Sequence, residues 1–461
     1  LEGRVSRELG NACHRRHEYV AALQHHERAL ALARVLGDVD AEAAATINRG
    51  NALQGLGRNE EAGADWIRGL DLAKACGNPR WEGNAHGNLG LLAEDRGDYE
   101  EALAHHGRWL DLASESGDRQ AEGRARGNLG HTLRLLGRFE EAERELERYR
   151  EIAREIGDRR GEGVATGNLA MLLLDRGRHE EAREELERYL LIARETANRG
   201  AENVAVGNLG VVAWHQGRIA DALELIGRQV ELARDVGREA DEAVPTGNLG
   251  LLWLALGRVE EARKHFELAL GLARRHGLKR VEGYQLHFLG MTALQTGDLD
   301  AARERLEEVL AQRRATGYRK GVAETLVAIA RLDRRSNDAK SARSRLEEAL
   351  AISEELGQSG IEAAARAHLA VLGGDAGAAV RAHRESAAET GHCERMESAF
   401  LLWQATGDPD HLTEARTMLG SLTEHAPEEH RASLREDVPL HREIREAWAE
   451  HAGSGDGPTS S

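Results

Sequence analysis

The sequence contains little proline, few aromatic residues and no long apolar segment. Only six of its 461 residues are proline, and four of those six lie after residue 400. Aromatic residues make up 4% of the chain. No apolar run reaches the roughly 18 residues that a membrane-spanning helix requires. Because proline is scarce and no segment can cross a bilayer, the sequence favours long helices and predicts no membrane partner.

Cysteine is also scarce. The three cysteines, Cys13, Cys76 and Cys393, lie far apart in the sequence. Their spacing fits neither a metal-binding motif nor the disulfide framework of a small secreted domain. The first residues, LEGRVSRELG, do not form a signal peptide. We therefore expect a protein of the reducing cytoplasm that binds no metal ion.

Acidic residues outnumber basic residues, so the formal net charge is -17 at pH 7. Proteins that bind nucleic acid neutralise phosphates with a basic surface, so this balance argues against a nucleic-acid partner. The commonest residues are Ala, Leu, Glu and Arg, which is the composition of helical proteins. The composition therefore predicts an all-α protein.

Small residues recur every 40 residues with almost no insertion, which indicates a repeat architecture. We call each set of equivalent positions a column. The first glycine column comprises Gly10, Gly50, Gly90, Gly130, Gly210, Gly250 and Gly290, with Ala170 in the remaining place. The second comprises Gly57, Gly97, Gly137, Gly177, Gly217, Gly257 and Gly297. The third comprises Gly37, Gly77, Gly117, Gly157, Gly237, Gly277, Gly317 and Gly357. An alanine column comprises Ala22, Ala62, Ala102, Ala142, Ala182, Ala222, Ala262, Ala302 and Ala342.

The residue types in these columns indicate two antiparallel helices in each 40-residue repeat. Gly117 followed by Asp118 indicates that one helix ends in a left-handed residue and that an aspartate caps the next helix. Gly137 marks the tight turn inside a unit. The first glycine column and the alanine column place small residues where two helices cross closely. Three glutamates fall near the start of the first helix, where the helix dipole favours a carboxylate: Glu122, Glu162 and Glu202.

This pattern resembles the tetratricopeptide repeat. Leu129 and Gly130, a turn glycine seven residues later at Gly137 and an alanine five residues after that at Ala142 match its core spacing. The usual unit has about 34 residues. The longer unit here is similar to those of spindle-orientation adaptors with GoLoco tails and of repeat arrays in bacterial signalling proteins. The resemblance is strong over residues 1–360 and weaker to residue 425.

The resemblance implies a right-handed superhelical solenoid of about ten helical hairpins. We expect a repeat array over residues 1–425, degenerate after residue 360, one or two capping helices over 426–450 and a disordered tail over 451–461. The array begins in repeat phase at residue 1, without an initiator Met or a polar cap. We therefore expect the chain to be a piece of a longer protein.

A column of asparagines is the main candidate for a binding site. It comprises Asn48, Asn88, Asn128, Asn168, Asn208 and Asn248, and it ends at Phe288. The resemblance places this position on the concave face of the array. A carboxamide has one acceptor and two donors, so a row of them can bind the backbone of an extended peptide whatever its side chains. The alternative is that each asparagine bonds to a neighbouring helix, or that repeat duplication copied it.

Residues one helical turn from the asparagines share their face. They are polar in the N-terminal repeats and apolar in the middle repeats, so the expected groove suits an amphipathic segment. We select as candidate contacts Arg124, Arg134, Met171, Leu174, Val211 and Trp214. Trp214 is the strongest of them because an exposed indole can anchor a partner, whereas Trp253 is expected in the core. Pro245 requires its helix to start late or to kink.

No motif predicts catalysis. The pairs His25-His26 and His105-His106 occupy equivalent positions of two second helices, and adjacent residues do not share a helix face. Neither pair is therefore expected to chelate a metal. The sequence contains no zinc-helix motif, Walker loop or nucleophile elbow. We expect no cofactor and no catalytic residues.

The sequence thus predicts a non-enzymatic scaffold that binds a peptide or helical segment of a partner protein in its concave groove. The alternative is a sensor or regulatory module of a larger bacterial signalling protein, either a kinase or a STAND-type ATPase, that recognises a folded partner.

Overall fold

The computed structural model of this protein describes residues 1–16, 18–236 and 239–453. This part of the chain forms 24 α-helices and two short 3-10 helices and contains no strand, which confirms the expected all-α repeat fold. None of the described helices is both long and apolar enough to cross a membrane. The chain divides into two compact units, Leu1–Leu172 (unit 1) and Leu173–Ser461 (unit 2).

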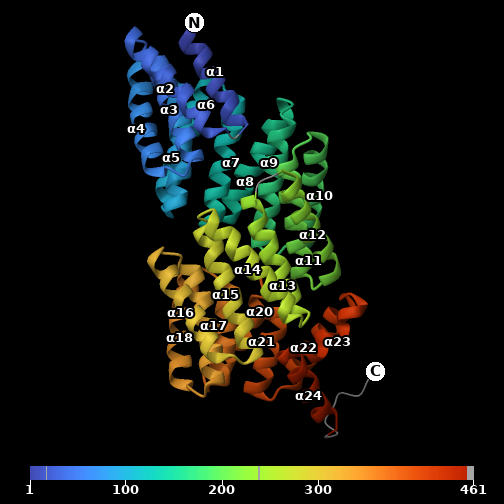
Figure 1. The fold of residues 1–461 in the computed structure, drawn as a ribbon. Coiled ribbons are helices and arrows are strands. Elements are labelled where there is room, and N and C mark those ends of the chain that lie inside the picture. Colours follow the sequence, from blue (N-terminus) through green and yellow to red (C-terminus); the bar gives the residue numbers. More distant parts are fainter. Residues whose placement is uncertain (17, 237–238, 454–461) are drawn as a thin grey trace. The chain divides into compact units, whose positions relative to one another are not determined.

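Unit 1 consists of helical hairpins in which consecutive helices pack against each other (Figure 1). Its helices are α1 (Glu2–Arg15), α2 (Tyr19–Leu36), α3 (Val39–Gly55), α4 (Asn59–Cys76), α5 (Pro79–Arg96), α6 (Tyr99–Ser116), α7 (Arg119–Leu135), α8 (Phe139–Glu155) and most of α9 (Arg159–Asp175). The odd-numbered helix is the first helix of each hairpin.

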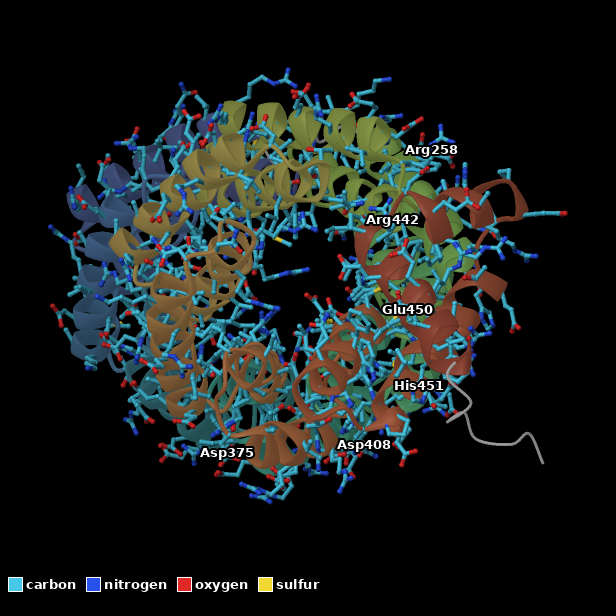
Figure 2. All side chains as sticks on the ribbon, turned by 90° about the horizontal axis from the view of Figure 1, so that it is seen from below. Arg258, Asp375, Asp408, Arg442, Glu450 and His451 are labelled. Carbon is cyan, nitrogen blue, oxygen red and sulfur yellow. The ribbon has the colours of Figure 1, made fainter. Side chains whose placement is uncertain are left out.

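Unit 2 continues the same pattern from the end of α9. Its regular hairpins use α10 (His179–Glu195), α11 (Arg199–His215), α12 (Ile219–Val236), α13 (Ala243–Ala255), α14 (Val259–Arg275), α15 (Lys279–Thr296), α16 (Leu299–Ala315), α17 (Arg319–Arg335) and α18 (Ala339–Glu355). Less regular helices follow: α19 (Ser359–Val371), α20 (Ala376–Glu385), α21 (His392–Thr406), α22 (Pro409–Glu424), α23 (Arg431–Glu436) and α24 (Pro439–Gly453). The capping residues Asp375 and Asp408, before α20 and α22, are exposed (Figure 2).

The turns have the backbone that the glycine columns predict. Gly117, between hairpins, has φ +69°, and Gly137, inside a hairpin, has φ +74°. Two columns lack glycine at one place each, and there Ala197 and Asn337 adopt the same left-handed conformation, with φ 49° and 57°. The side chain of Asp118 accepts a hydrogen bond from the Ala121 amide at 3.0 Å, as an N-cap does.

The first glycine column allows the two helices of a hairpin to touch. A Cβ atom on Gly130 would lie 2.6 Å from Cγ of Leu146 and 3.3 Å from the carbonyl oxygen of Ala142. Ala142 itself is fully buried. In the same way, the other glycines of the column face the side chain sixteen residues later: Gly10 faces His26, Gly50 Trp66, Gly90 His106, Gly210 Ile226, Gly250 Phe266 and Gly290 Leu306.

A row of ion pairs joins successive hairpins. Glu202 of α11 pairs with Arg194 of the preceding helix at 3.1 Å and with Arg199 of its own helix at 2.9 Å. Equivalent pairs between hairpins are Arg34–Glu42, Arg154–Glu162, Arg234–Glu242 and Arg274–Glu282. The helix dipole therefore explains only part of the glutamate column, because each of these carboxylates also connects its hairpin to the one before.

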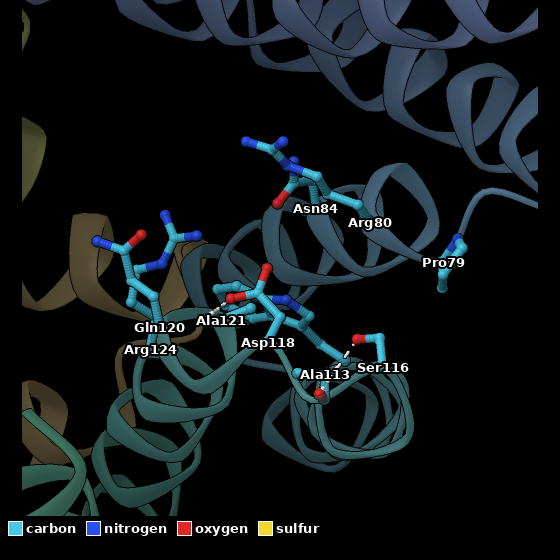
Figure 3. A pocket seen from close by; sticks show the side chains of 10 residues that line it. Pro79, Arg80, Asn84, Ala113, Ser116, Asp118, Gln120, Ala121 and Arg124 are labelled. Carbon is cyan, nitrogen blue, oxygen red and sulfur yellow. Dashed lines mark hydrogen bonds between the residues drawn. The ribbon is translucent and has the colours of Figure 1, made fainter. Parts of the chain in front are cut away.

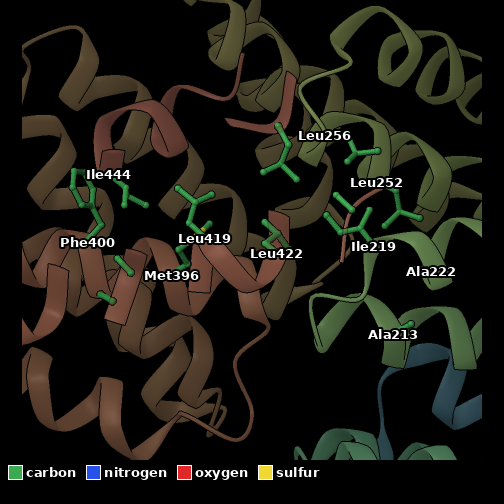
Figure 4. Close-up of a cluster of buried hydrophobic side chains, with 14 of the residues drawn as sticks. Ala213, Ile219, Ala222, Leu252, Leu256, Met396, Phe400, Leu419, Leu422 and Ile444 are labelled. Carbon is green, nitrogen blue, oxygen red and sulfur yellow. The ribbon is translucent and has the colours of Figure 1, made fainter. Parts of the chain in front are cut away.

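An apolar core of unit 2 joins segments that are far apart in the sequence. Ile219 of α12 and Leu256, which follows α13, pack with Phe400 of α21, Leu419 of α22 and Ile444 of α24 (Figure 4). All five are at least 95% buried. The C-terminal helices thus cover the ends of earlier hairpins of the same unit.

Two local expectations concern proline and the C-terminus. A 3-10 helix, η1 (Glu239–Glu242), precedes α13, so Pro245 is the third residue of a helix that starts late, where no N–H is needed.

Near the C-terminus, η2 (Glu428–His430), α23 and α24 follow α22. Because α24 ends at Gly453, the expected tail begins inside this helix, and its remaining residues, 454–461, lie outside the described residues.

We expect opposite effects from adding a methyl group at two helical glycines of unit 1. Gly130→Ala should lower the free energy of unfolding by about 1–3 kcal/mol, because Leu146 and the Ala142 carbonyl leave no room. In Gly107→Ala, in α6, the added Cβ atom would have no neighbour within 4 Å. This variant should raise the free energy of unfolding by up to about 1 kcal/mol, because alanine has a higher helix propensity than glycine. Urea unfolding followed by circular dichroism measures both, and equal stability of the two variants would contradict the packing argument.

Candidate peptide-binding surface

The six asparagines occupy equivalent positions on the first helices of successive hairpins. Unit 1 contains Asn48 of α3, Asn88 of α5, Asn128 of α7 and Asn168 of α9, and unit 2 contains Asn208 of α11 and Asn248 of α13. All six side chains are half-buried. Each asparagine directly precedes the buried helix-crossing region of its hairpin, so its backbone position is set by the packing described above.

Five of the six carboxamides are available to a ligand. Asn88 is the exception, because its Nδ2 donates to Oδ1 of Asn51 at 2.7 Å, and that oxygen also accepts from Nε1 of Trp66 at 3.0 Å. The other five side chains make no hydrogen bond within the described part of the chain, and none of their polar atoms is fully buried. Bonding to a neighbouring helix thus explains one asparagine and leaves the rest of the column open to solvent.

The glycines that precede the asparagines serve helix packing. A Cβ atom on Gly127 would lie 2.9 Å from the ring of Tyr149, and one on Gly87 would lie 2.9 Å from the ring of Trp109. In unit 2, Cβ atoms on Gly207 and Gly247 would collide with glutamine side chains. These glycines are therefore needed for contacts inside the protein, whether or not a ligand approaches them.

A small polar cavity adjoins the asparagines of unit 1. It has a volume of about 150 Å³ and lies between α5, α6 and α7, with side chains that include Arg80, Asn84, Trp109 and Arg124 (Figure 3). Asn84 and Arg124 lie one helical turn before Asn88 and Asn128. The Arg124 guanidinium lies over the Trp109 ring, 5.7 Å from its centre.

Two arginines of this cavity lack an acidic partner. Neither Arg80 nor Arg124 forms an ion pair with any described carboxylate, although most arginines of the hairpin junctions do. Asp118, which also lines the cavity, uses its carboxylate to cap α7. Arg124 could be predicted from the sequence because it shares a helix face with Asn128, whereas Arg80 could not, because it lies near the start of α5, in the preceding hairpin. Arg134, the other arginine candidate, is half-buried and already has an interaction partner.

The surface beside the asparagines is apolar in the middle hairpins. In unit 2, Val204 and Val244 lie one turn before Asn208 and Asn248 and are 47% and 48% exposed. The candidates Leu174 and Val211 of unit 2 are half-buried, as is Met171 of unit 1. Val204 and Val244 supply apolar contact area next to the free carboxamides.

Trp214 does not have the exposure that the sequence analysis expected. Its side chain is half-buried and packs against the apolar core that α21, α22 and α24 complete in unit 2. Trp253 packs against this core and against a second one around Phe266, as expected for a core residue. The sequence could not show the difference, because the helices that pack beside Trp214 lie close to the C-terminus, far from it in the sequence.

A buried carboxylate lies beneath the polar part of this surface. Glu94 of α5 accepts a hydrogen bond from the Thr132 hydroxyl, and its oxygens lie 3.6 Å from Nε2 of His106 and 3.4 Å from Nδ1 of His131. Burial raises the pKa of Glu94, but the interactions with His106, His131 and Thr132 outweigh it and lower this pKa to about 2. The cluster holds α5, α6 and α7 together.

The histidine pairs have packing roles. His26 and His106 are buried beneath Gly10 and Gly90. His105 lies 2.8 Å from His86, measured between their Nδ1 atoms. No group of three or more His, Cys, Asp or Glu side chains that could bind a metal occurs among the residues with described positions.

The repeat geometry agrees with a comparison of sequences. The sequence profile of the tetratricopeptide repeat matches residues 41–115, 81–155, 121–195, 200–275 and 285–355, which together exceed half of the chain. The chain belongs to the tetratricopeptide repeat family. Its hairpins are tetratricopeptide repeats with 40-residue spacing, and the columns described above are their helix-crossing and turn positions. No curated protein sequence matches the chain significantly.

Solved structures of other repeat proteins share the fold. A Rap protein complexed with competence and sporulation factor matches with a TM-score of 0.58 at 14% identity, covering 77% of this chain and 99% of that one. The apo quorum sensor NprR from B. thuringiensis matches with 0.56 at 16% identity, covering 73% and 96%. A STAND protein with a tetratricopeptide repeat sensor, from Pyrococcus horikoshii, matches with 0.51 at 17% identity, covering 72% of this chain. The present chain spans about half (51%) of that STAND protein.

We expect Glu94 to make stability depend on pH. A carboxyl whose pKa falls from 4.5 to about 2 on folding stabilises the folded state above pH 4.5, and this contribution disappears as the pH falls towards 2. Glu94→Gln should therefore lower the free energy of unfolding by about 2 kcal/mol near pH 7 and progressively less below pH 4.5.

Urea unfolding at a series of pH values measures this difference. Glu101→Gln, at an exposed carboxylate of α6, is the control and should show little effect at any pH. A deficit of Glu94→Gln that is the same at pH 7 and pH 3 would contradict the assignment.

Proposed function

We propose that this tetratricopeptide repeat protein is a non-enzymatic interaction scaffold that binds an extended segment of a partner protein along its asparagine column. The observation that carries the proposal is the set of five equivalent carboxamides without a partner inside the protein: Asn48, Asn128, Asn168, Asn208 and Asn248. Each can donate to a peptide carbonyl and accept from a peptide N–H. Because every residue of the ligand carries both groups, this mode of binding tolerates many ligand sequences.

The side chains beside the column would then select among ligands. The apolar side chains Val204 and Val244 of unit 2 favour aliphatic or aromatic ligand residues. The arginines of the unit 1 cavity, Arg80 and Arg124, favour an acidic ligand residue, since a guanidinium binds a carboxylate in a geometry that matches both. Among the candidate contacts, Arg134 and Trp214 contribute less, because both already have contacts inside the protein.

The named functions of similar structures support a peptide or protein ligand. One is a Rap protein complexed with competence and sporulation factor, and another is a quorum sensor. The STAND protein carries its tetratricopeptide repeats as a sensor, which supports the alternative that this chain is the sensor module of a larger signalling protein. The two proposals share the binding surface and differ in whether the ligand is a segment or a folded partner.

Replacing three free carboxamides tests the column directly. In Asn128→Ala/Asn168→Ala/Asn208→Ala, the loss of one hydrogen-bonding group per residue should weaken peptide binding roughly 100-fold without unfolding the protein. A displayed library of random peptides of about 12 residues, selected on the wild-type chain, supplies the ligands, and fluorescence anisotropy measures their affinity.

The matched control removes three exposed carboxamides away from the column, in Gln24→Ala/Asn59→Ala/Gln404→Ala. It should bind as the wild type does, and circular dichroism verifies that both variants fold. Unchanged affinity of the column variant for the selected peptides would refute the asparagine column as the binding site.

Neutralising the cavity arginines tests ligand selection separately. Arg80→Gln/Arg124→Gln should bind acidic peptides from the same selection roughly tenfold more weakly and should lose most of the salt dependence of binding. The control Arg58→Gln/Arg138→Gln removes two exposed arginines that already pair with Glu61 and Glu141, and it should leave both properties unchanged. Equal losses in the two variants would mean that net charge, and not the cavity, attracts acidic peptides.

A further inference from the structure

The turns inside three successive hairpins of unit 2 are covered by the C-terminal helices. A Cβ atom on Gly177 would lie 1.9 Å from the Ala388 carbonyl oxygen, one on Gly217 would lie 3.0 Å from the His392 ring, and one on Gly257 would lie 2.8 Å from the Ser433 carbonyl oxygen. The equivalent glycines Gly57, Gly97, Gly137 and Gly297 have no such neighbour within 4 Å. We call the contact between residues 386–453 and these three turns the seam.

The seam has few hydrogen bonds between its two sides. The Ala220 amide donates to the His425 carbonyl at 3.0 Å, and the Ser433 hydroxyl donates to the Leu256 carbonyl at 2.8 Å. The Trp253 indole meets the His430 ring edge to face, with 5.3 Å between the ring centres. Apart from these contacts and the interaction of His179 with the Ala388 backbone, the seam depends on the apolar core that Figure 4 shows.

Three histidines lie at the seam, and a fourth, His441, is buried within the C-terminal segment. His179 and His215, from adjacent hairpins, stack with 5.4 Å between ring centres and 12° between planes, and Gly391 packs onto the His215 ring. The Nδ1 atoms of both stacked rings are buried and make no hydrogen bond. His392 bonds the Met418 carbonyl at 2.8 Å, and His441 bonds the Leu434 carbonyl at 2.7 Å.

Burial outweighs the nearby groups that favour protonation of the stacked pair. Burial and the His215 ring lower the pKa of His179, against weaker opposing effects of the Ala388 backbone and Glu180. Burial and Lys320 of α17 lower the pKa of His215. Glu394 is the carboxylate on the C-terminal side, and it approaches Gly391 next to His215.

The other two histidines behave in the same way. Burial lowers the pKa of His392, with His425 and Arg395 acting in the same direction and the Met418 carbonyl and Glu394 acting against it. Burial lowers the pKa of His441 to about 4 despite its bond to Leu434. Since a solvent-exposed histidine titrates near 6.5, His179, His215 and His392, which contact the other side of the seam, bind protons more readily when it is open.

We propose that residues 386–453 form a pH-sensitive latch, which is closed on the turns of three hairpins near neutral pH and opens in mild acid when the seam histidines become charged. Two charged rings repel each other at the distance of His179 and His215, and their buried Nδ1 atoms have no hydrogen-bond partner that would stabilise the charge. Opening exposes the turns at Gly177, Gly217 and Gly257, and with them the apolar surface around Ile219 and Leu256.

Hydrogen exchange followed by mass spectrometry on the full chain tests the latch. At about pH 5.5, compared with about pH 7.5, seam segments around Ala220, His392 and Ser433 should lose protection roughly tenfold after correction for the intrinsic pH dependence of exchange. The uncovered turns at Gly97 and Gly137 in unit 1 should keep theirs. No change in the seam segments, or an equal loss in unit 1, would overturn the proposal.

Two double variants assign the response to the stacked pair. His179→Phe/His215→Phe keeps two stacked rings that cannot be charged, and its seam should remain protected at the lower pH. The control His86→Phe/His105→Phe changes another close histidine pair, in unit 1, and its seam should open as in the wild type. A His179→Phe/His215→Phe seam that opens like the wild type would overturn the role of the pair, and the wild-type measurement stands by itself if this variant does not fold.

Discussion

The contact between a glycine of each first helix and the side chain sixteen residues later is the constraint on which the repeat array depends. At Gly130 and Leu146 there is no space for even one added carbon, so the two helices lie as close as their backbones permit. A fully buried alanine, such as Ala142, completes the crossing. With the crossing fixed, left-handed residues end many of the helices, and Asp or Asn caps begin some of them, such as α6, α7 and α16.

This close packing also defines which face remains for binding. The glycines of a first helix are used on the side that faces the second helix, where Gly127 meets the Tyr149 ring. Asn128, the next residue, lies outside that contact. Its side chain is half-buried and makes no hydrogen bond within the described part of the chain. The same step of one residue separates packing from exposure where Gly127, Gly207 and Gly247 precede an asparagine, and it explains why the two residue types recur together there. Only at Asn88 does a neighbouring residue, Asn51, take up the amide.

The two units use the same repeat for different purposes at their hairpin turns. In unit 1 the turns at Gly57, Gly97 and Gly137 are open, and the polar cluster around Glu94 lies beneath the candidate binding surface. In unit 2 three of the equivalent turns are covered by the C-terminal helices, with Ile219 and Leu256 as part of a shared core. Covering these turns leaves Trp214 half-buried and creates a contact with several histidines that the repeat alone does not require.

The sequence by itself determined the helical hairpins, their boundaries and their family, because those properties depend on local residue types at a fixed spacing. Glycine with a positive φ, an aspartate three residues before an amide and a small residue at a helix crossing have the same meaning in every repeat. Only the tertiary structure decided which side chains of equivalent position are free. It paired Glu202 with Arg194 of the previous hairpin, left Arg80 and Arg124 beside one cavity, and covered Trp214 with helices from the end of the chain. Those outcomes depend on contacts between residues far apart in sequence, which a 40-residue period does not encode.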